Sequence, residues 1–441
     1  MTPFQLPQPA NHARQLFAGA WSSRVPADTI HPGPRQNRWD RGERVAPLPV
    51  AEVPIAAILH ELWRPRGFHP DPLTREPTGT ARRAIPSAGG CYPVQVHLVA
   101  GDGCDLSSGR FALDPRDASL VRRTGTVQPG RTPRGALVVL GVLPQRTRGK
   151  YHHRTPPLLV ADTAYALSGI IHRAAAYGLE CERIPAAPDE LARVLGLPTY
   201  ARWQEVWPGT GPELLLTALW IRRPRWRANV ASKRAGRADA SAILEEIWAE
   251  TGRPRVETGP RPLPEREPRT DPETAAWADT LDRDFLGSVS APSRARPLHS
   301  DVLARRRSLP LHAPGARDAA EAAPERVLTA LASIQVPPAC RIEVIGADGL
   351  ADPSLAASCA GQHWIRSLHG LVRFHADRSP TPATVWWAST TAATILYSCL
   401  GAGLPLGFRP IGGWHAHPGA PLTLHGLGFR SDPTKGAHGA H

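Results

Sequence analysis

One short loop in the first half of the chain has the composition of a binding loop. It runs Pro86-Ser87-Ala88-Gly89-Gly90 and leads into an alternating apolar segment at 94–99. Alanine and glycine leave room where a loop must approach a flat group or turn its amides outward, and the serine adds a hydroxyl. A plain glycine-rich turn before a strand is the simplest interpretation of the loop alone. The full string through Tyr92 and Pro93 is more specific and favours a binding loop.

A basic segment further along could carry proton transfer. Lys150 and Tyr151 end the string Arg-Thr-Arg-Gly-Lys-Tyr at 146–151, between an apolar run at 136–142 and a helix predicted from about 157. A lysine beside a tyrosine can act as a general acid/base pair where burial or a neighbouring cation brings a pKa toward neutrality. A solvated basic loop is the usual alternative, so the spacing alone leaves both interpretations open.

The second half supplies groups suited to an anion. Arg305-Arg306-Arg307-Ser308 forms one run, and guanidinium groups match phosphate oxygens bidentately. Pro410-Ile411-Gly412-Gly413 follows the second long apolar segment, and Arg430 ends a predicted strand. Taken singly, each arginine is an ordinary surface charge and the glycine pair an ordinary turn. Their order along the chain makes them a candidate site.

Both halves of the chain place these residues on the same succession of elements. The periodicity predicts a helix, two strands, a long helix and a final strand in each half. They span 54–63, 94–99, 136–142, 157–177 and 213–221 in the first half, and 326–334, 341–345, 370–374, 384–399 and 422–429 in the second. The long helices end at Gly178-Leu179 and Gly403-Leu404, which are 225 residues apart (403 minus 178). We therefore predict an internal duplication.

The length of 441 residues exceeds what one hydrophobic core usually serves and indicates two or three domains. We predict an irregular arm at 1–45, a first domain at 46–226, a linker at 227–296 and a diverged second domain at 297–441. The 48 prolines and 39 glycines fit such an arm and linker. Within the linker only 243–248 is predicted to be helical.

Composition and charge narrow the possible partners. The net charge is +13, but the arginines are scattered, and no zinc-finger or recognition-helix pattern is present, so we expect no nucleic-acid partner. No two of the six cysteines have metal-ligand spacing, which predicts free thiols in a reducing cytoplasm and no metal site. We expect no secretory signal at the N-terminus. The uncharged segment 379–408 contains three prolines and several polar residues, and predicts a buried helix rather than a membrane span.

The string Pro-Ser-Ala-Gly-Gly-x-Tyr-Pro at 86–93, followed by its alternating strand, resembles the nitroreductase superfamily. Within that superfamily, the Arg-Thr-x-x-Lys-Tyr string at 146–151 resembles the dehydrogenases of thiazole/oxazole-modified peptide pathways, the SagB/McbC type. The resemblance covers about residues 46–225. It implies an α+β nitroreductase-like fold, bound FMN, a loop at 86–90 that lies against the flavin, and Lys150 and Tyr151 as the catalytic pair.

The same resemblance implies a phosphate clamp in the second half. Arg306-Arg307-Ser308 is similar to the arginine doublet and serine that hold the FMN phosphate in the family. Pro310 stands where some members carry a further arginine, whose place Arg305 could take. The segment 410–413, with Pro410, Gly412 and Gly413, lies where the family places the amide that hydrogen-bonds flavin N5. Arg430 resembles the basic residue of the terminal strand that reaches the phosphate.

In nitroreductase-fold homodimers the clamp and the amide come from one subunit and the Pro-Ser loop from the other. Here the loop lies in the first half, and the clamp and amide lie in the second. We therefore predict one FMN site between two duplicated halves that form a pseudo-dimer, with the opposite site decayed. The first half has 182–185 in place of the glycine pair, and the second half has 335–340 in place of the loop.

The implied reaction is oxidation of a peptide thiazoline or oxazoline to the thiazole or oxazole, with FMN as redox cofactor. A modified precursor peptide and a cyclodehydratase are the implied partners. Two alternatives remain: another flavin reaction on a natural product, and a non-catalytic partner that scaffolds a biosynthetic complex. The first alternative is distinguished by whether the reaction depends on Lys150 and Tyr151. The second predicts a protein without the yellow colour of a flavin.

Overall fold

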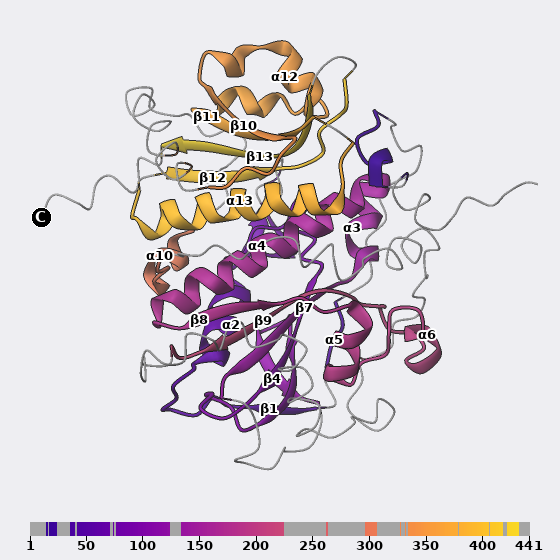
Figure 1. Cartoon of the computed structure of the whole chain (residues 1–441), viewed down its shortest axis with the longest axis vertical. Coiled ribbons are helices and arrows are strands. Elements are labelled where there is room, and N and C mark those ends of the chain that lie inside the picture. Colours follow the sequence, from indigo (N-terminus) through magenta and orange to yellow (C-terminus); the bar gives the residue numbers. More distant parts are fainter. Residues whose placement is uncertain are drawn as a thin grey trace, which may run out of the picture.

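The computed structural model in Figure 1 describes most of the chain outside the predicted arm and linker. The described residues are 15, 17–23, 36–39, 42–70, 74, 76–123, 134–224, 262, 296–306, 327, 331, 334–377, 379–404, 406–417 and 421–431, without the side chains of 304 and 305. Arg307, Ser308, Pro310 and the predicted helix at 243–248 therefore lie outside the described residues.

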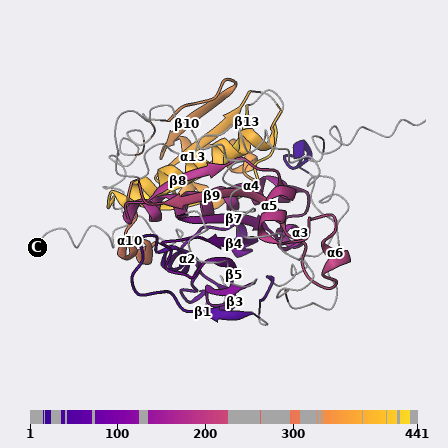
Figure 2. The same cartoon turned by 60° about the horizontal axis from the view of Figure 1, so that its bottom comes forward.

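Two β-sheets enclose two long helices (Figures 1 and 2). Helix α4 (Thr155–Ala176) lies against the first sheet, and α13 (Pro382–Gly401) lies between α4 and the second sheet. Each helix thus has a sheet on one side and the other helix on the opposite side. Because a helix buried on several sides must be apolar nearly all round, both sequences are almost free of charge.

The first sheet has seven strands in the order β1-β6-β5-β4-β7-β9-β8, and all its pairings are antiparallel. The strands are β1 (Glu43–Val45), β4 (Val94–Ala100), β5 (Gly109–Asp114), β6 (Ser119–Arg122), β7 (Ala136–Val142), β8 (Glu180–Ile184) and β9 (Leu214–Arg222). Strands β4, β7 and β9 were predicted from their apolar runs, and the four others were not.

The second sheet repeats the arrangement of the last four strands of the first, from β4 to the edge strand β8. Its strands are β10 (Cys340–Gly346), β11 (Gly370–Ala376), β12 (Leu406–Ile411) and β13 (Leu422–Ser431). Their order, β10-β11-β13-β12, matches β4-β7-β9-β8 strand for strand along the chain, and every pairing is again antiparallel. In both halves the long helix follows the second of these strands. This common topology supports the predicted duplication.

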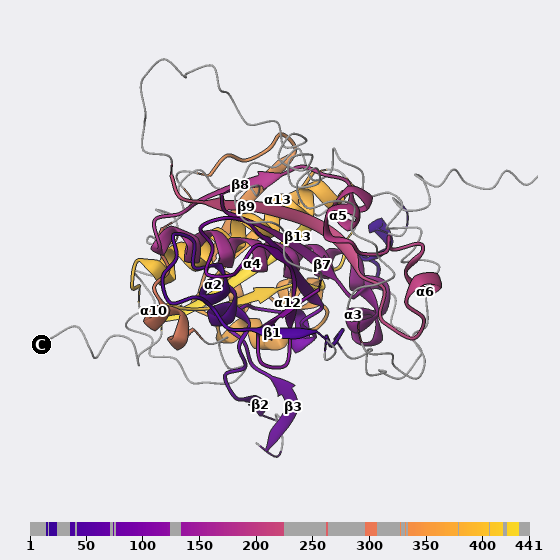
Figure 3. The same ribbon diagram turned by 90° about the horizontal axis from the view of Figure 1, so that it is seen from below.

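Shorter elements connect these layers. They are α2 (Ile55–Trp63), α3 (Pro144–Tyr151), α5 (Pro188–Leu195), α6 (Trp203–Val206), α10 (Ser300–Arg305) and α12 (Pro353–Ser358), with 3₁₀ turns η1 (Ala88–Gly90), η2 (His152–Arg154), η5 (Gly349–Ala351) and η6 (His363–Ser367). A separate hairpin of β2 (Phe68–Pro70) and β3 (Pro77–Ala81) projects from the body in Figure 3. Of the helix predicted at 326–334, residues 327, 331 and 334 are described; the first two are helical and the last is not.

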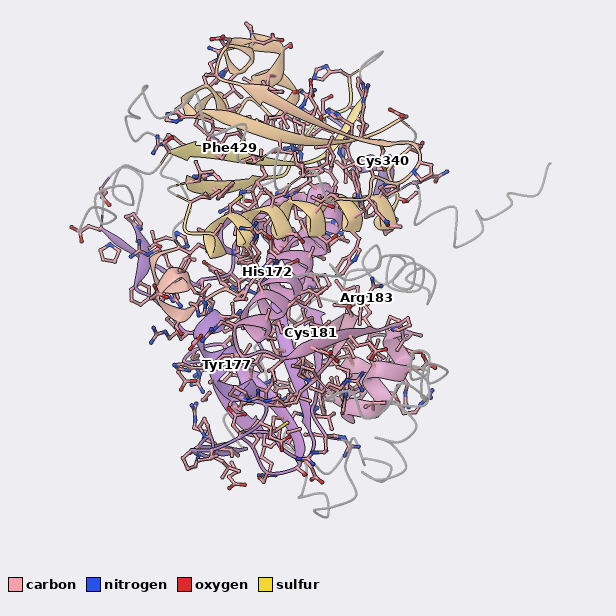
Figure 4. The ribbon with its side chains drawn as sticks, turned by 60° about the vertical axis from the view of Figure 1, so that its left-hand side comes forward. His172, Tyr177, Cys181, Arg183, Cys340 and Phe429 are labelled. Atoms are coloured by element: carbon pink, nitrogen blue, oxygen red, sulfur yellow. The ribbon has the colours of Figure 1, made fainter. Side chains whose placement is uncertain are left out.

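One hydrophobic core runs through both halves, because α4 and α13 pack against each other. In Figure 4, His172 of α4 lies beneath α13, and its ring centroid is 5.7 Å from that of Tyr397. Part of the predicted arm also joins this core. Phe17 and Trp21 are buried, and the Trp21 indole donates to the Thr423 carbonyl at 2.8 Å. These two residues of the arm therefore pack against the body of the protein.

The uncharged segment at 379–408 forms α13, whose long apolar run is buried against α4 and the second sheet. Among the described residues, no helix combines the length and the apolarity that crossing a bilayer requires. The helix begins at Pro382, and the Thr381 hydroxyl accepts a hydrogen bond from the Thr384 amide as its N-cap.

Candidate functional site

The loop that the sequence singled out rests on a buried carboxylate of α4. The Ser87 hydroxyl donates to Asp162 at 2.6 Å, and the Ala88 amide donates to the other oxygen of the same carboxylate at 2.9 Å. The Ser87 hydroxyl in turn accepts from the Tyr92 amide at 2.8 Å. These three bonds fix the loop at its beginning and its end.

Lys150 and Tyr151, at the end of α3, reach the middle of this loop. The Lys150 ammonium donates to the Gly89 carbonyl at 3.0 Å. Gly89 has φ +54°, and a Cβ there would collide with the Tyr151 hydroxyl and the Lys150 ammonium. The structure thus brings the predicted catalytic pair and the predicted flavin loop together, and it explains why glycine is required at position 89.

Burial determines the protonation of the acids in this region. It raises the pKa of the Tyr151 phenol, so this hydroxyl stays protonated at neutral pH and acts as a hydrogen-bond donor. Burial also raises the pKa of Asp162 to about 7, although the bonds from Ser87 and Ala88 act in the opposite direction. The thiol of Cys91, next to the loop, has its pKa raised to about 11 by burial.

Arg306 brings a buried positive charge to the same region from the second half. It follows α10, is only 7% exposed, and donates to the Arg83 carbonyl at 3.4 Å. Its Nε and Nη1 have no hydrogen-bond partner among the described residues, which also give it no ion pair. Burial lowers the pKa of Arg306, and three tyrosines nearby partly oppose this. They are Tyr92, Tyr165 and Tyr397.

A buried guanidinium with two unpaired N–H groups is costly, because a charge removed from water needs a partner. Such a group fits a site that takes an anion. The Arg83 guanidinium, 4.7 Å from the centre of the Tyr92 ring, supports the loop just beside Arg306. Tyr92 is also bonded to the backbone of Arg83, because its hydroxyl accepts a hydrogen bond from the Arg83 amide at 3.2 Å.

Several positively charged side chains lie near His69, which is close to Gly90 of the loop. Burial lowers the pKa of His69, in the projecting hairpin, and so do four cations nearby. These are Arg82, Lys150, Arg306 and Arg409. The His69 ring lies 3.3 Å from the Tyr92 hydroxyl. A cluster of cations from four separate segments indicates an anionic ligand.

Side chains on one face of α4 contact the site segments of both halves of the chain. Leu158, Asp162 and Tyr165 follow each other at i, i+4 and i+7, so they form a single stripe. Leu158 contacts Gly412, where a Cβ would lie 2.5 Å from the leucine methyl group. One turn further, Asp162 holds the loop, and the Tyr165 hydroxyl lies 3.0 Å from His425 Nε2. The helix thus places the glycine pair, the loop and the Arg306 region next to one another.

The remaining predicted residues of the second half lie in β12, in the turn after it and in β13. Pro410 is in β12, and Gly413, with φ +82°, follows it. Register pairs Arg430 with Gly407 and Arg409 with Gly428, so both arginines lie on one face of the sheet. Arg430 is buried, and its charge contributes to the lowered pKa of His369. The described structure therefore places Arg430 beside His369.

Sequence reasoning missed three residues that the structure places here: His69, Asp162 and Arg409. Asp162 left one signal, since it is the only acidic residue between 155 and 176. A single aspartate in an otherwise apolar helix must be paired when the helix is buried. His69 and Arg409 left no such signal, because non-local packing brings them to the loop.

Within the described residues, no group of three or more His, Cys, Asp or Glu side chains could hold a metal ion. All six cysteines are free.

Two solved structures are similar to this chain. A candidate nitroreductase from Anabaena variabilis matches 96% of this chain and 99% of its own, with a TM-score of 0.55 and 13% identity. The E. coli microcin synthetase McbBCD complex with truncated pro-MccB17 bound matches 51% of this chain and 85% of its own, with 16% identity. The TM-score of that second match is 0.29. No family model and no curated protein matches. From the first match, over almost the whole of both chains, we conclude that this protein has the α+β nitroreductase fold.

Proposed function

We propose that the protein is an FMN-dependent dehydrogenase that oxidises thiazoline or oxazoline rings of a modified peptide to thiazoles or oxazoles. The observation that carries the proposal is Arg306, a buried guanidinium with two unpaired N–H groups, next to a loop that Lys150 and Tyr151 also reach. The nitroreductase fold gives the setting, and the Lys-Tyr string gives the reaction type.

The residues fit FMN at both ends of that molecule. Arg306, with Arg307 and Ser308 after it, would hold the phosphate, because guanidinium groups bind phosphate with charge-assisted hydrogen bonds. The loop 86–90 would lie against the ring system, and its glycines keep side chains out of that space. The segment 410–413 would offer a backbone amide to the ring edge. When bound, FMN would accept the hydride that the azoline ring loses.

The chain's own residues would manage the proton. Oxidation of an azoline removes two hydrogens from adjacent ring carbons, one as hydride and one as proton. Because burial keeps Tyr151 protonated, its hydroxyl can donate a hydrogen bond to the ring but cannot accept the proton. We assign removal of the proton to Nζ of Lys150. The Gly89 carbonyl, 3.0 Å from that nitrogen, holds it in place.

The partners follow from this chemistry. An azoline is made by cyclodehydration of a serine, threonine or cysteine in a peptide, so a cyclodehydratase must act on the precursor peptide first. Six free cysteines fit a reducing compartment, and we propose the cytoplasm.

The test combines colour with mass. The purified protein should show the absorbance of bound flavin, and peptides bearing azolines should lose two hydrogens per ring when incubated with it. A colourless protein would favour the scaffold alternative. A yellow protein that leaves azolines intact would favour a different flavin reaction on a natural product.

A further inference from the structure

We propose that Asp162 is a positioning residue for the cofactor loop, which it holds so that Gly89 can receive Lys150. The proposal rests on the proposed function for the meaning of the loop, but its geometry is independent of any cofactor. The carboxylate accepts from the Ser87 hydroxyl and from the Ala88 amide, one on each oxygen.

The loop has few other ways to keep this shape. Gly89 and Gly90 both have positive φ, at +54° and +70°, and glycine is the residue with the widest choice of backbone conformation. Two bonds to one carboxylate, on a helix buried between two layers, remove that freedom. The Gly89 carbonyl then faces the Lys150 ammonium at 3.0 Å.

The second half shows what stands in place of Asp162. Counting from the helix-ending glycines, Trp387 of α13 is its counterpart, since 387 minus 162 is also 225. The Trp387 indole donates to the Gln335 carbonyl at 3.2 Å, in the segment before β10, just as Asp162 holds the segment before β4. The position thus anchors the equivalent segment in both halves, but only the first half anchors a glycine loop with an acceptor.

The test uses Cys91 as a reporter of the loop. This thiol directly follows the loop, is buried, and has its amide bonded to the Ala88 carbonyl at 3.0 Å. We would replace Asp162 by leucine, which has similar size but no acceptor, and measure alkylation of each cysteine by peptide mass spectrometry. Cys104 and Cys399, buried elsewhere, are controls within the same sample.

In Asp162→Leu we expect Cys91 to be alkylated on the order of tenfold faster, with Cys104 and Cys399 unchanged, because about one or two net hydrogen bonds are lost. Thr163→Val, which removes a buried hydroxyl bonded to the Leu159 carbonyl, should leave all three rates unchanged. A rate for Cys91 equal to that of the wild type would overturn the proposal. So would an equal rise at all three thiols, since that reports general loosening.

Two further variants complete the experiment. If Asp162→Leu does not fold, Ser87→Ala removes one donor while keeping the carboxylate, and selective exposure of Cys91 is still expected. Asp162→Asn keeps an acceptor and should restore most of the protection. In each variant the dissociation constant of FMN is measured as a second readout, and we expect it to rise with the Cys91 rate. A protein that binds no FMN would contradict the proposed function. The role of Asp162 would still be decided by the alkylation rates, because these can be measured without flavin.

Discussion

At the scale of single residues, replacing Arg306 should have different effects on flavin binding and on the stability of the fold. Replacing it by alanine removes charge-assisted bonds to phosphate, each worth about 1.5–3 kcal/mol, so flavin should be lost. The flavin-free variant should nevertheless be at least as stable as the flavin-free wild type, because an unpaired buried cation is removed. Flavin titration and urea denaturation measure the two effects. Arg110→Ala, a buried arginine on the other side of the first sheet, should leave flavin affinity unchanged.

Lys150 and Tyr151 should separate chemistry from binding. Lys150→Ala and Tyr151→Phe should keep FMN bound, because neither side chain belongs to the proposed phosphate clamp or amide contact. Azoline oxidation should slow by a factor of about 10²–10⁴, which is typical for the loss of a positioned general acid or base. Arg148→Ala, on the same helix, serves as the control in single-turnover assays. Wild-type rates in both variants would show that the pair has no catalytic role and only ends helix α3.

Asp162 should leave a pH dependence in the stability of the protein. Burial raises the pKa of Asp162 to about 7 in the folded protein, from an ordinary value near 3.8. Between about pH 4 and pH 7 the folded state therefore holds a proton that the unfolded chain has released, and stability decreases as the pH rises. Asp162→Asn has no such proton to lose.

The free energy of unfolding of the wild type relative to Asp162→Asn should therefore fall across this window, by at most about 1.4 kcal/mol per pH unit. Urea denaturation at several pH values measures the difference, and other titrating groups cancel in the subtraction. The neighbours Cys91, Tyr92, Tyr151 and Tyr165 all stay neutral there, because burial raises the pKa of each. A constant difference between pH 4 and pH 7 would contradict the expectation.

At the scale of elements, the contact between α4 and the turn after β12 should control the site. A Cβ on Gly412 would lie 2.5 Å from a Leu158 methyl group, so Gly412→Ala must displace that leucine or the turn. Overpacking of this kind costs about 1–3 kcal/mol, and we expect weaker FMN binding. Adding Leu158→Ala should restore much of the affinity by opening space. If the double variant binds no better than Gly412→Ala alone, the turn does not act through this contact.

The elements that could be predicted from the sequence are those with an apolar pattern of their own. These elements are α2, β4, β7, β9, β10, β11, β13 and the two long helices. Helix α3 was missed because its string Pro-Gln-Arg-Thr-Arg-Gly-Lys-Tyr has no apolar stripe, and β8 because Glu-Cys-Glu-Arg-Ile is mostly charged. Packing against their neighbours determines the structure of both.

The same division applies to the site. Residues in a compact string, such as 86–90 and 150–151, could be identified from their order, and the structure places them in contact. His69, Asp162 and Arg409 lie outside such a string, and each reaches the loop from a different element. An aspartate in a helix normally faces water, whereas Asp162, the single acidic residue of α4, is buried and bonded to the loop.

At the scale of the whole molecule, the predicted duplication would give one chain the two faces that a homodimer obtains from two subunits. The repeated strand order and the helix pair between the sheets support a pseudo-twofold relation, which would generate two equivalent sites. The site described above uses the loop of the first half and Arg306 of the second. Its counterpart would need a glycine loop before β10 and a glycine pair after β8.

The counterpart contains other groups. Trp387 is bonded to the Gln335 carbonyl, and the guanidinium of Arg183 lies 5.5 Å from the centre of the Trp386 ring. Figure 4 shows Arg183 extending from β8 toward α13. After β8 the chain continues through Pro185 into α5 without a glycine pair. An indole thus contacts the segment before β10, where the first half has a carboxylate bonded to its loop.

We therefore predict one FMN per chain. Flavin released by heat or acid from a protein sample of known concentration should approach one equivalent, and saturation with added FMN should not raise it to two. Trp387→Ala should leave this number unchanged, because opening the counterpart supplies neither a phosphate clamp nor an amide donor. Two equivalents would show that the second site is intact and that the indoles do not close it. No flavin, even after reconstitution with FMN, would overturn the assignment of the cofactor.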